Sequence, residues 1–332
     1  MKPFQKITDF STLQILGDSR RRDILRALMA APATLTQLGE FLNMHPAKVR
    51  YHLKKLEEEK LVELTSTNIV RGFVEKYYSA TSQTLLANLS LLPHTPNKES
   101  VVAMGSHDFA LDLLAQTLSE NQSTPEMFAL PVGSLDGLMA LRQGICQLAG
   151  CHLFDPLSGE YNLPYVRHIF PDWDMRLVTL ASRRQGLVVA PGNPLQIRKL
   201  EDIAQEGVRF INRKKGAGTR LWLDQQLREK AIPAEMVQGY GWAVNTHLAV
   251  AQAVANGQAD TGICVMAAAR QKELDFIPLF EERYDLVIPE EHYQNPLLTP
   301  ALETLHSGEF RNAVNALSGY DTKKAGQETI VQ

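Results

Sequence analysis

Apolar positions in the first eighty-five residues recur at helical spacing. Two helices are predicted from one such set, at Leu13, Leu16, Ile24, Leu25 and Leu28. Gly17-Asp18-Ser19 interrupts the set, so Asp18 or Ser19 is expected to cap the second helix. A short third helix is expected to start near Thr36, with Leu38, Phe41 and Leu42 on its apolar face.

A basic helix is predicted to begin at Pro46, a residue suited to the first helical position. Val49, Leu53 and Leu56 share its apolar face. The residues that project from its other faces are Lys48, Arg50, Tyr51, Lys54 and Lys55. Cations on such a helix suit DNA phosphates, and the first three of these residues are positioned to reach base edges. The alternative is a solvated helix with ordinary surface lysines.

Two runs rich in β-forming residues follow, LVELTS and GFVEKYYSA. They predict a β-hairpin with its turn at residues 68–72, and Arg71 at the tip is a candidate for entering a minor groove. Residues 1–85 hold 13 lysines and arginines against 9 aspartates and glutamates, although the whole chain has a net charge of −3. A basic amino-terminal piece on an acidic body is typical of a DNA-binding domain joined to another domain.

The stretch LGDSRRRDILRAL…TLTQLGEFLNMHPAKVRYHLKKLEEEKLVEL resembles the ArsR-type winged helix-turn-helix repressors over about 70 residues. The resemblance implies operator binding by the basic helix. Metal-sensing members carry paired cysteines in the helix before the recognition helix, where this chain has TQLGEF. A metal-thiolate switch is therefore not expected in this domain.

After residue 100 the chain alternates short apolar runs with amphipathic segments, which predicts an α/β body with largely parallel sheets. Three expected strand-to-helix turns carry glycine beside a hydroxyl: Gly105-Ser106, Gly133-Ser134 and Gly216-Ala217-Gly218-Thr219-Arg220. Backbone amides and hydroxyls at helix N-termini suit an anion. In the alternative interpretation, the hydroxyls only cap the helices and the glycines only make the turns.

Catalytic and metal-binding patterns are weak. KKGAGTR matches neither a phosphate-binding loop ending in GK[ST] nor a complete GxGxxG motif. Ser106, His107 and Asp108 are adjacent in the chain, which is not how a catalytic triad is built. His152 and His168 lack partners at ligand spacing, and Cys264 lies in an apolar run. No catalytic residue, metal ligand or cofactor is therefore assigned.

The body, over about residues 105–322, resembles the periplasmic-binding-protein-like domain found on helix-turn-helix regulators and on some molybdopterin-biosynthesis enzymes. The motifs that carry this resemblance are GSHD, GSLDGLMAL, FDPLSGEYNLPYV, QGLVVAPGNP, NRKKGAGTR, THLAVAQAVANGQADTGI and FEERYDLVIP. It implies two lobes that close on a small ligand. The chain is expected to cross between them near residues 181–186 and to return near residues 267–284.

Relatives implied by this resemblance include molybdate- and tungstate-binding proteins, whose sites use neutral N–H and O–H donors rather than paired cations. Ser106, Ser134 and Thr219 suit that chemistry, and Thr246 lies at another expected helix start. Asp108 would repel an anion if it faced the cleft. Arg220 and Tyr284 are expected either to reach the ligand or to brace the cleft.

Together these features predict a winged helix-turn-helix domain at residues 1–88, a linker at 89–100 and a two-lobed sensing domain at 101–332. The sequence has no signal-peptide pattern and no apolar run of the roughly 20 residues that span a bilayer. Its three cysteines are unclustered, so a cytoplasmic protein with reduced thiols is expected.

The expected function is a one-component regulator, a repressor and homodimer, that binds double-stranded DNA and senses molybdate, tungstate or a related oxyanion. Residues 4–16 and 85–92 are the expected dimer contacts. Two alternatives stay open: an enzyme of molybdenum-cofactor metabolism with a DNA-binding head, and a DNA-binding scaffold whose body senses no ligand.

Overall fold

The chain forms two compact units, Met1–Pro93 and His94–Gln332, in a computed structural model that describes residues 1–7, 9–70, 73–87 and 98–332. Each unit has its own hydrophobic core. Within the described ranges, no helix is both long enough and apolar enough to span a lipid bilayer. Most of the expected linker at 89–100 lies outside the described residues, but its last residue, Ser100, begins the first strand of the second unit.

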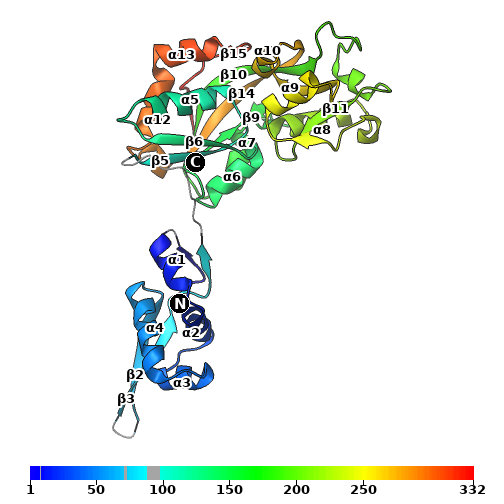
Figure 1. Cartoon of the computed structure of the whole chain (residues 1–332). Coiled ribbons are helices and arrows are strands. Elements are labelled where there is room, and N and C mark those ends of the chain that lie inside the picture. Colours follow the sequence, from blue (N-terminus) through cyan, green and yellow to red (C-terminus); the bar gives the residue numbers. More distant parts are fainter. Residues whose placement is uncertain (8, 71–72, 88–97) are drawn as a thin grey trace. The chain divides into compact units, whose positions relative to one another are not determined.

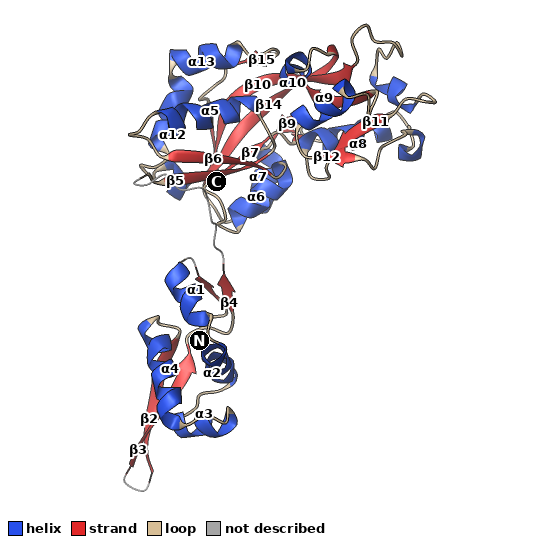
Figure 2. Cartoon of the chain, in the orientation of Figure 1, coloured by secondary structure: helices blue, strands red, loops and turns tan. Residues whose placement is uncertain are grey.

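The first unit packs its helices against a β-hairpin (Figures 1 and 2). Its elements are β1 (Gln5–Ile7), α1 (Phe10–Leu16), α2 (Ser19–Ala30), α3 (Leu35–Phe41), α4 (Pro46–Glu58), β2 (Val62–Val70), β3 (Phe73–Ala80) and β4 (Leu85–Ala87). β2 and β3 pair antiparallel, and β1 pairs parallel with β4. The apolar faces of α2, α3 and α4 meet the hairpin in one core that includes Ile24, Leu38 and Leu53.

Local side-chain chemistry sets the helix ends in this unit. Asp18 caps α2 by accepting a hydrogen bond from the amide of Arg20, and Pro46 begins α4, as predicted. α3 starts one residue before the expected Thr36. Thr34 and Gln37 form a reciprocal capping box, so the helix begins at Leu35. The predicted hairpin turn at 68–72 is also too long, because β2 continues through residue 70.

A ten-stranded mixed sheet runs through the second unit in the order β12-β11-β13-β10-β14-β7-β5-β6, with β15 and β16 also paired to β10. Its strands are β5 (Ser100–Gly105), β6 (Glu126–Pro131), β7 (Leu148–Cys151), β10 (Met175–Val189), β11 (Phe210–Arg213), β12 (Ala243–Val244), β13 (Thr261–Val265), β14 (Asp275–Pro289), β15 (Tyr320–Asp321) and β16 (Glu328–Val331). A small separate pair consists of β8 (Phe154–Asp155) and β9 (Glu160–Tyr161).

The helices of this unit fall into groups on two lobes (Figure 2). The first lobe holds α5 (Phe109–Glu120), α6 (Ser134–Arg142), α7 (Leu163–Ile169), α11 (Glu290–Tyr293), α12 (Thr299–His306) and α13 (Gly308–Asn315). The second lobe holds α8 (Gly218–Glu229), α9 (His247–Ala255), α10 (Met266–Gln271) and the 3-10 turns at Leu200–Ala204 and Ala234–Met236.

The long strands β10 and β14 connect the lobes. They pair antiparallel from Met175 with Pro289 to Val189 with Asp275. The expected crossings at 181–186 and 267–284 fall on these strands, although residues 266–271 form α10 before the return begins. Parallel pairing is confined to the two sides of the sheet, among β5–β7 and among β11–β13. The prediction of largely parallel sheets is therefore wrong at the centre, where two crossings in opposite directions run side by side.

Candidate functional site

The β5–α5 and β6–α6 junctions bring two buried serines together. The hydroxyl oxygens of Ser106 and Ser134 are 3.0 Å apart, and both residues are at most 1% exposed. Gly105 cannot carry a side chain, because a Cβ there would lie 2.1 Å from the carbonyl oxygen of Gly150. Gly133 adopts a φ of +94°. These glycines allow the tight turns that bring the two hydroxyls within hydrogen-bonding distance.

The β11–α8 loop of the second lobe lies against the N-terminus of α6 in the first. The carbonyl of Gly216, whose φ is +85°, accepts a hydrogen bond of 3.2 Å from the amide of Leu135. Beside it the ammonium of Lys214 lies 2.8 Å from a carboxylate oxygen of Asp136. The loop with Gly216, predicted to form an anion site, is therefore close to the turn that carries Ser134.

The end of this loop also lies beside the chain that follows β7. Ala217 is fully buried at the N-cap position of α8, and Gly218 is the first helical residue. A Cβ on Gly218 would lie 2.5 Å from the carbonyl oxygen and 2.7 Å from ring atoms of His152. Glycine at position 218 thus permits α8 to approach His152 closely.

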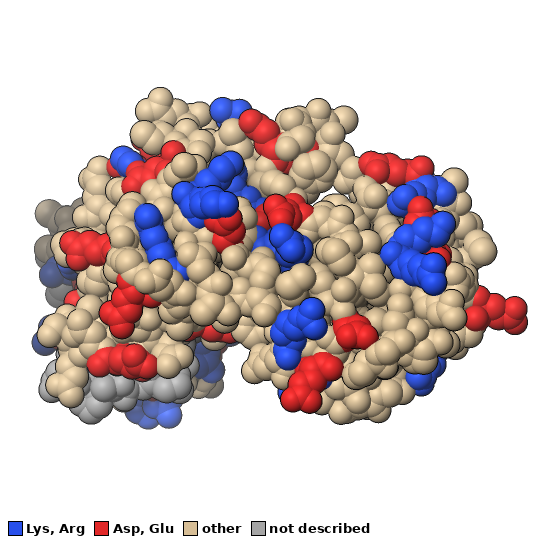
Figure 3. Space-filling view, turned by 90° about the horizontal axis from the view of Figure 1, so that it is seen from above, with Lys and Arg blue, Asp and Glu red and all other residues tan. Residues whose placement is uncertain are grey.

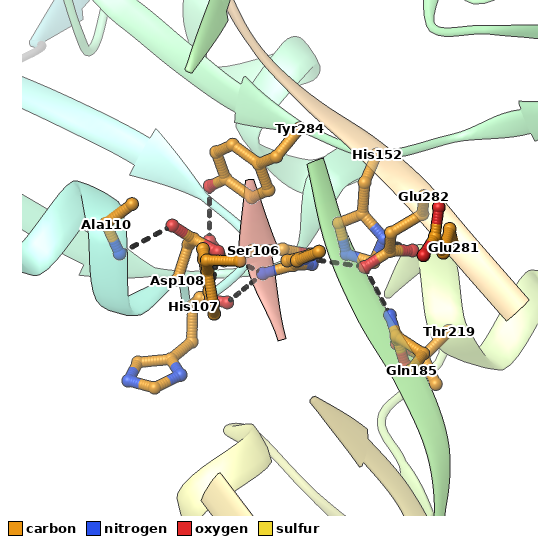
Figure 4. A network of polar contacts seen from close by, with 12 residues as sticks. Ser106, His107, Asp108, Ala110, His152, Gln185, Thr219, Glu281, Glu282 and Tyr284 are labelled. Carbon is orange, nitrogen blue, oxygen red and sulfur yellow. Dashed lines mark hydrogen bonds and ion pairs between the residues drawn. The ribbon is translucent and has the colours of Figure 1, made fainter. Parts of the chain in front are cut away.

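A buried arginine on β10 joins two carboxylates from different elements, Asp108 and Glu282, both of which are labelled in Figure 4. Arg183 forms an ion pair with Asp108 through Nη1, and its Nε lies 2.6 Å from Glu282 on β14. The hydroxyl of Tyr320 donates to Asp108 over 2.8 Å, and Asp108 also caps α5 through the amide of Ala110. Asp108 was expected to repel an anion only if it faced the cleft, and its charge is paired with Arg183.

The charges in this network control the ionisation of Glu282. Burial by itself raises the pKa of a carboxylate, but Arg183 and His152 lower the pKa of Glu282 to about 2. Glu282 is therefore ionised at neutral pH. Burial by itself lowers the pKa of Arg183, but Glu282 and Asp108 raise it above its usual value. These opposite charges satisfy one another in the buried interior.

A second buried arginine, Arg213, forms no ion pair with a described carboxylate at contact distance. Arg213, the last residue of β11, is 2% exposed, and its Nη2 donates to the carbonyl of Asn245 over 2.8 Å. Its Nε and Nη1 have no hydrogen-bond partner among the described residues. Burial and the nearby charge of Arg183 lower the pKa of Arg213 to about 10, so it remains protonated at neutral pH. A buried, incompletely bonded cation is costly unless an anion joins it.

Three histidines surround the same region. The ring centroid of His247 lies 6.3 Å from that of His107 and 6.4 Å from that of His152. His152 Nδ1 lies 2.8 Å from a carboxylate oxygen of Glu282. The ring atoms without a partner in the described structure are His107 Nδ1, His152 Nε2, and His247 Nδ1 and Nε2. Arg183 Nη2 is also buried without a hydrogen-bond partner in the described structure. Polar atoms without a partner therefore come from several elements around His247.

Thr219 contacts the network through another side chain. Its hydroxyl is 3.0 Å from the amide nitrogen of Gln185, and that amide nitrogen also donates to Glu282 (Figure 4). Thr219 and Gln185 are both buried. Thr219 therefore positions Gln185 and Glu282, in addition to lying at the start of α8.

The remaining predicted ligand residues have structural partners. The hydroxyl of Tyr284 donates to the carbonyl of Ser106 over 2.5 Å. Arg220 pairs with Asp224 at 2.7 Å, and Thr246 caps α9 through its hydroxyl. For Arg220 and Tyr284 these contacts correspond to the bracing alternative of the two that the sequence left open.

Sequence reasoning missed the charged groups at the centre of the cleft. Arg213 ends the short strand FINR, and Arg183 and Glu282 lie in the middle of the long strands β10 and β14. Charged residues within buried strands were the available signal. Their mutual pairing depends on strand register, with Arg183 opposite Glu282, which no local motif encodes. The expectation of neutral donors did not include these buried arginines, which lie in the same region as the predicted hydroxyls.

Taken together, these buried residues offer more hydrogen-bond donors than the described part of the protein uses. Two guanidinium groups, two hydroxyls and the N-termini of α6 and α8 meet there. Such a set can hold a small anion with several oxygens by charge-assisted and neutral hydrogen bonds. Among the described residues, no group of three or more His, Cys, Asp or Glu is arranged to hold a metal ion.

The outer face of α4 in the first unit presents cations. Its exposed side chains include Lys48, Arg50, Tyr51 and Lys54. Lys55 is half-buried and lies 2.9 Å from Glu58, so its charge is partly used within the helix. Val49 and Leu53 on the opposite face are buried, so they anchor the helix while its basic face stays open. Arg71 lies outside the described residues.

The surface of the second unit differs from this basic face. On the side drawn in Figure 3, lysines and arginines alternate with aspartates and glutamates, and large neutral areas separate them. A continuous basic track, which a DNA backbone requires, does not form on that side. The candidate DNA surface is the exposed basic face of α4 in the first unit.

Comparisons with known proteins match both units. Residues 16–65 match the helix-turn-helix domain family, and residues 115–306, more than half of the chain, match the PBP superfamily domain. The uncharacterized protein YvgK of Bacillus subtilis is 37% identical over 232 residues, which cover 70% of this chain and 74% of that protein. An uncharacterized protein encoded in the 5′ region of a ferredoxin gene of Clostridium pasteurianum is 37% identical over 106 residues, covering 32% of this chain and 94% of its own.

A solved structure shares the fold of the second unit. It is a Clostridium perfringens protein assigned as a phosphate ABC transporter substrate-binding protein, with bound phosphate. The TM-score is 0.51 at 12% identity, and the match covers 67% of this chain and 99% of that one. A helix-turn-helix domain joined to a ligand-binding-protein-like domain is the architecture of a ligand-sensing transcription regulator. The chain belongs to the PBP superfamily, with a helix-turn-helix domain preceding the PBP domain.

Proposed function

We propose that this protein is a one-component transcriptional repressor whose effector is a small oxyanion bound between the lobes of the second unit. Molybdate and tungstate, expected from sequence, belong to this class, as does phosphate, which the Clostridium perfringens neighbour binds. Operator DNA would bind the outer face of α4 and the β2–β3 wing, as in other winged helices.

The observation that carries the effector class is the buried guanidinium of Arg213. It is protonated and 2% exposed, and two of its nitrogens have no partner in the described structure. An oxyanion would supply both the missing charge and the missing acceptors. The serine pair at 3.0 Å and the N-termini of α6 and α8 add neutral donors from both lobes.

Dimerisation would couple effector binding to DNA binding. Exposed apolar residues cover one part of the first unit, at Phe4, Phe10, Leu13 and Leu86, which are 53%, 55%, 37% and 48% exposed. A second copy is the occupant that suits them, because a dimer pairs two short half-sites on the operator. Effector-driven closure of the lobes would then bias the placement of the two winged helices.

Two other functions make different demands on the second unit. A molybdenum-cofactor enzyme would need a substrate turned over in the cleft. A DNA-binding scaffold with a non-sensing body would need no effector, but the incompletely bonded Arg213 has no purpose in that case. Incubation of the purified protein with molybdopterin precursors tests the first function, and ligand binding tests the second.

The decisive experiment is isothermal calorimetry of the full chain against phosphate, arsenate, sulfate, molybdate and tungstate, followed by operator binding in the presence of each binder. We expect micromolar or tighter binding of at least one oxyanion and a change in operator affinity of at least about fivefold, a typical coupling. If a folded protein binds none of them, the oxyanion class is refuted. Binding without any effect on operator affinity refutes the sensing role.

A further inference from the structure

The imidazole of His152 has one ring nitrogen without a hydrogen-bond partner in the described structure. Glu282 is ionised and accepts a hydrogen bond from His152 Nδ1 at 2.8 Å, which fixes the proton of the neutral ring on Nδ1. Burial, opposed by the charge of Glu282, lowers the pKa of His152, so the ring is neutral near pH 7. Its Nε2 is therefore a hydrogen-bond acceptor, and it is buried without a partner among the described residues.

His247 presents a second lone pair nearby. It is the first residue of α9 and is fully buried, and neither of its ring nitrogens has a partner in the described structure. Burial and the charges of Arg213 and Arg183 lower its pKa well below the usual value. A neutral imidazole has one N–H donor and one acceptor nitrogen, so His247 needs a ligand group of each kind.

The charged and titratable groups that face these two imidazoles come from every neighbouring element. Arg183 lies on β10, Arg213 ends β11, His107 follows β5, and Glu282 lies on β14. Glu282 is already satisfied by Arg183, Gln185 and His152. A ligand between the arginines and the histidines thus meets N–H donors on one side and imidazole lone pairs on the other.

We propose that the cleft selects an oxyanion that carries a proton at neutral pH, of the hydrogen phosphate type, and that His152 and His247 read that proton. This inference rests on the proposed oxyanion-sensing function and specifies its ligand class. The unprotonated oxygens accept from Arg183, Arg213 and the one free hydroxyl proton of the serine pair, and the ligand O–H donates to an imidazole nitrogen. Sulfate, molybdate and tungstate carry no proton near neutral pH. The imidazole lone pairs of His152 and His247 would therefore face oxygen lone pairs of these ions and receive no hydrogen bond.

Matched ligands test this proposal on the full chain. Phosphate and arsenate carry at least one proton near neutral pH, whereas sulfate is a similar tetrahedron without one. Calorimetry in two buffers of different protonation enthalpy gives both the affinity and the protons taken up on binding. We expect phosphate and arsenate to bind at least about tenfold more tightly than sulfate and molybdate, without net proton uptake. Equal or tighter binding of sulfate or molybdate overturns the proposal.

Variants at His247 assign the discrimination to this ring. His247→Leu removes the acceptor and is expected to reduce the phosphate-to-sulfate affinity ratio to within about threefold, whereas His247→Gln keeps a donor and an acceptor and retains most of it. His168→Leu, on the exposed side of α7, is the matched control. An unchanged ratio in a folded His247→Leu protein overturns the role of His247.

The outcomes separate this inference from the proposed function. Preferential binding of molybdate or sulfate refutes the selection for a proton but leaves oxyanion sensing intact. Absence of binding by any of the oxyanions refutes both. Thermal unfolding of each variant without ligand verifies that the second unit is folded.

Discussion

The hydroxyl oxygens of Ser106 and Ser134 lie 3.0 Å apart although the residues are 28 positions apart in the chain. One hydroxyl must donate to the other, and the Ser134 oxygen also lies 3.3 Å from the amide of His152. The pair therefore has a single hydroxyl proton left for another partner. The two serines act as one polar unit held by two strand-to-helix turns.

Removal of either hydroxyl is expected to weaken effector binding. In Ser134→Ala and Ser106→Ala, an unmade hydrogen bond in the closed cleft costs about 1–3 kcal/mol, or roughly 5- to 150-fold in affinity. The double variant is expected to lose less than the sum, because the two hydroxyls share one network. Calorimetry with the best-binding oxyanion measures the affinities. Ser158→Ala, in an exposed turn, is the control, and equal affinities of all three variants and the parent contradict the assignment.

Thr219→Val is expected to have a smaller effect than Ser134→Ala. The Thr219 hydroxyl is occupied by Gln185, so its loss acts through the positions of Gln185 and Glu282. A decrease in affinity of less than about fivefold is expected, with full recovery in Thr219→Ser. If Thr219→Val weakens binding more than Ser134→Ala does, Thr219 contacts the effector directly.

The sequence predicted the glycine turns and the hydroxyls because each is a local signal at a strand-to-helix junction. It also predicted the basic face of α4, since an apolar stripe fixes the opposite side of a helix. It could not predict that Arg183 would meet both Asp108 and Glu282, because those contacts depend on the register of β10 and β14 and on three separate elements. It treated His152 as an isolated residue for the same reason.

Replacement of the exposed cations of α4 is expected to weaken operator binding. Arg50→Ala should cost about 1–3 kcal/mol on the operator if it contacts a base, whereas Lys54→Ala should weaken all sequences alike and reduce the salt slope by about 1. Lys55→Ala is the matched control on the same helix, because its ammonium is paired with Glu58. Fluorescence anisotropy with operator and random DNA at several salt concentrations measures these effects. Unaltered operator binding by Arg50→Ala and Lys54→Ala would mean that α4 does not recognise the operator.

The exposed apolar residues of α1 are expected to hold the dimer together. Phe10 and Leu13 are 55% and 37% exposed, and a double change to glutamate buries charge in any interface they form. Sedimentation of the parent is expected to give a dimer, and Phe10→Glu/Leu13→Glu a monomer. Loss of the second half-site contact should weaken operator binding by roughly a hundredfold. A parent that is monomeric at micromolar concentration, yet binds the operator, contradicts this arrangement.

The stability of the second unit is expected to fall as the pH falls below about 6.5, the ordinary value from which burial lowers the pKa of His152 and His247. A group whose pKa is lower in the folded state binds more protons when unfolded, so its contribution is present above the unfolded pKa and is lost below it. Glu282, with a pKa lowered from 4.5 to about 2, adds a second loss that begins only below pH 4.5. The two contributions therefore occupy different pH windows.

Tryptophan fluorescence during urea unfolding isolates this effect, because Trp173, Trp222 and Trp242 all lie in the second unit. In the parent, the urea midpoint is expected to decrease as the pH falls from about 7 to about 5. His247→Leu removes one titrating ring that faces Arg213, Arg183, His107 and His152, so its midpoint should vary less over this window. His168→Leu, which removes an exposed ring, should follow the parent. A His247→Leu protein with the same pH profile as the parent would mean that His247 does not titrate differently on folding.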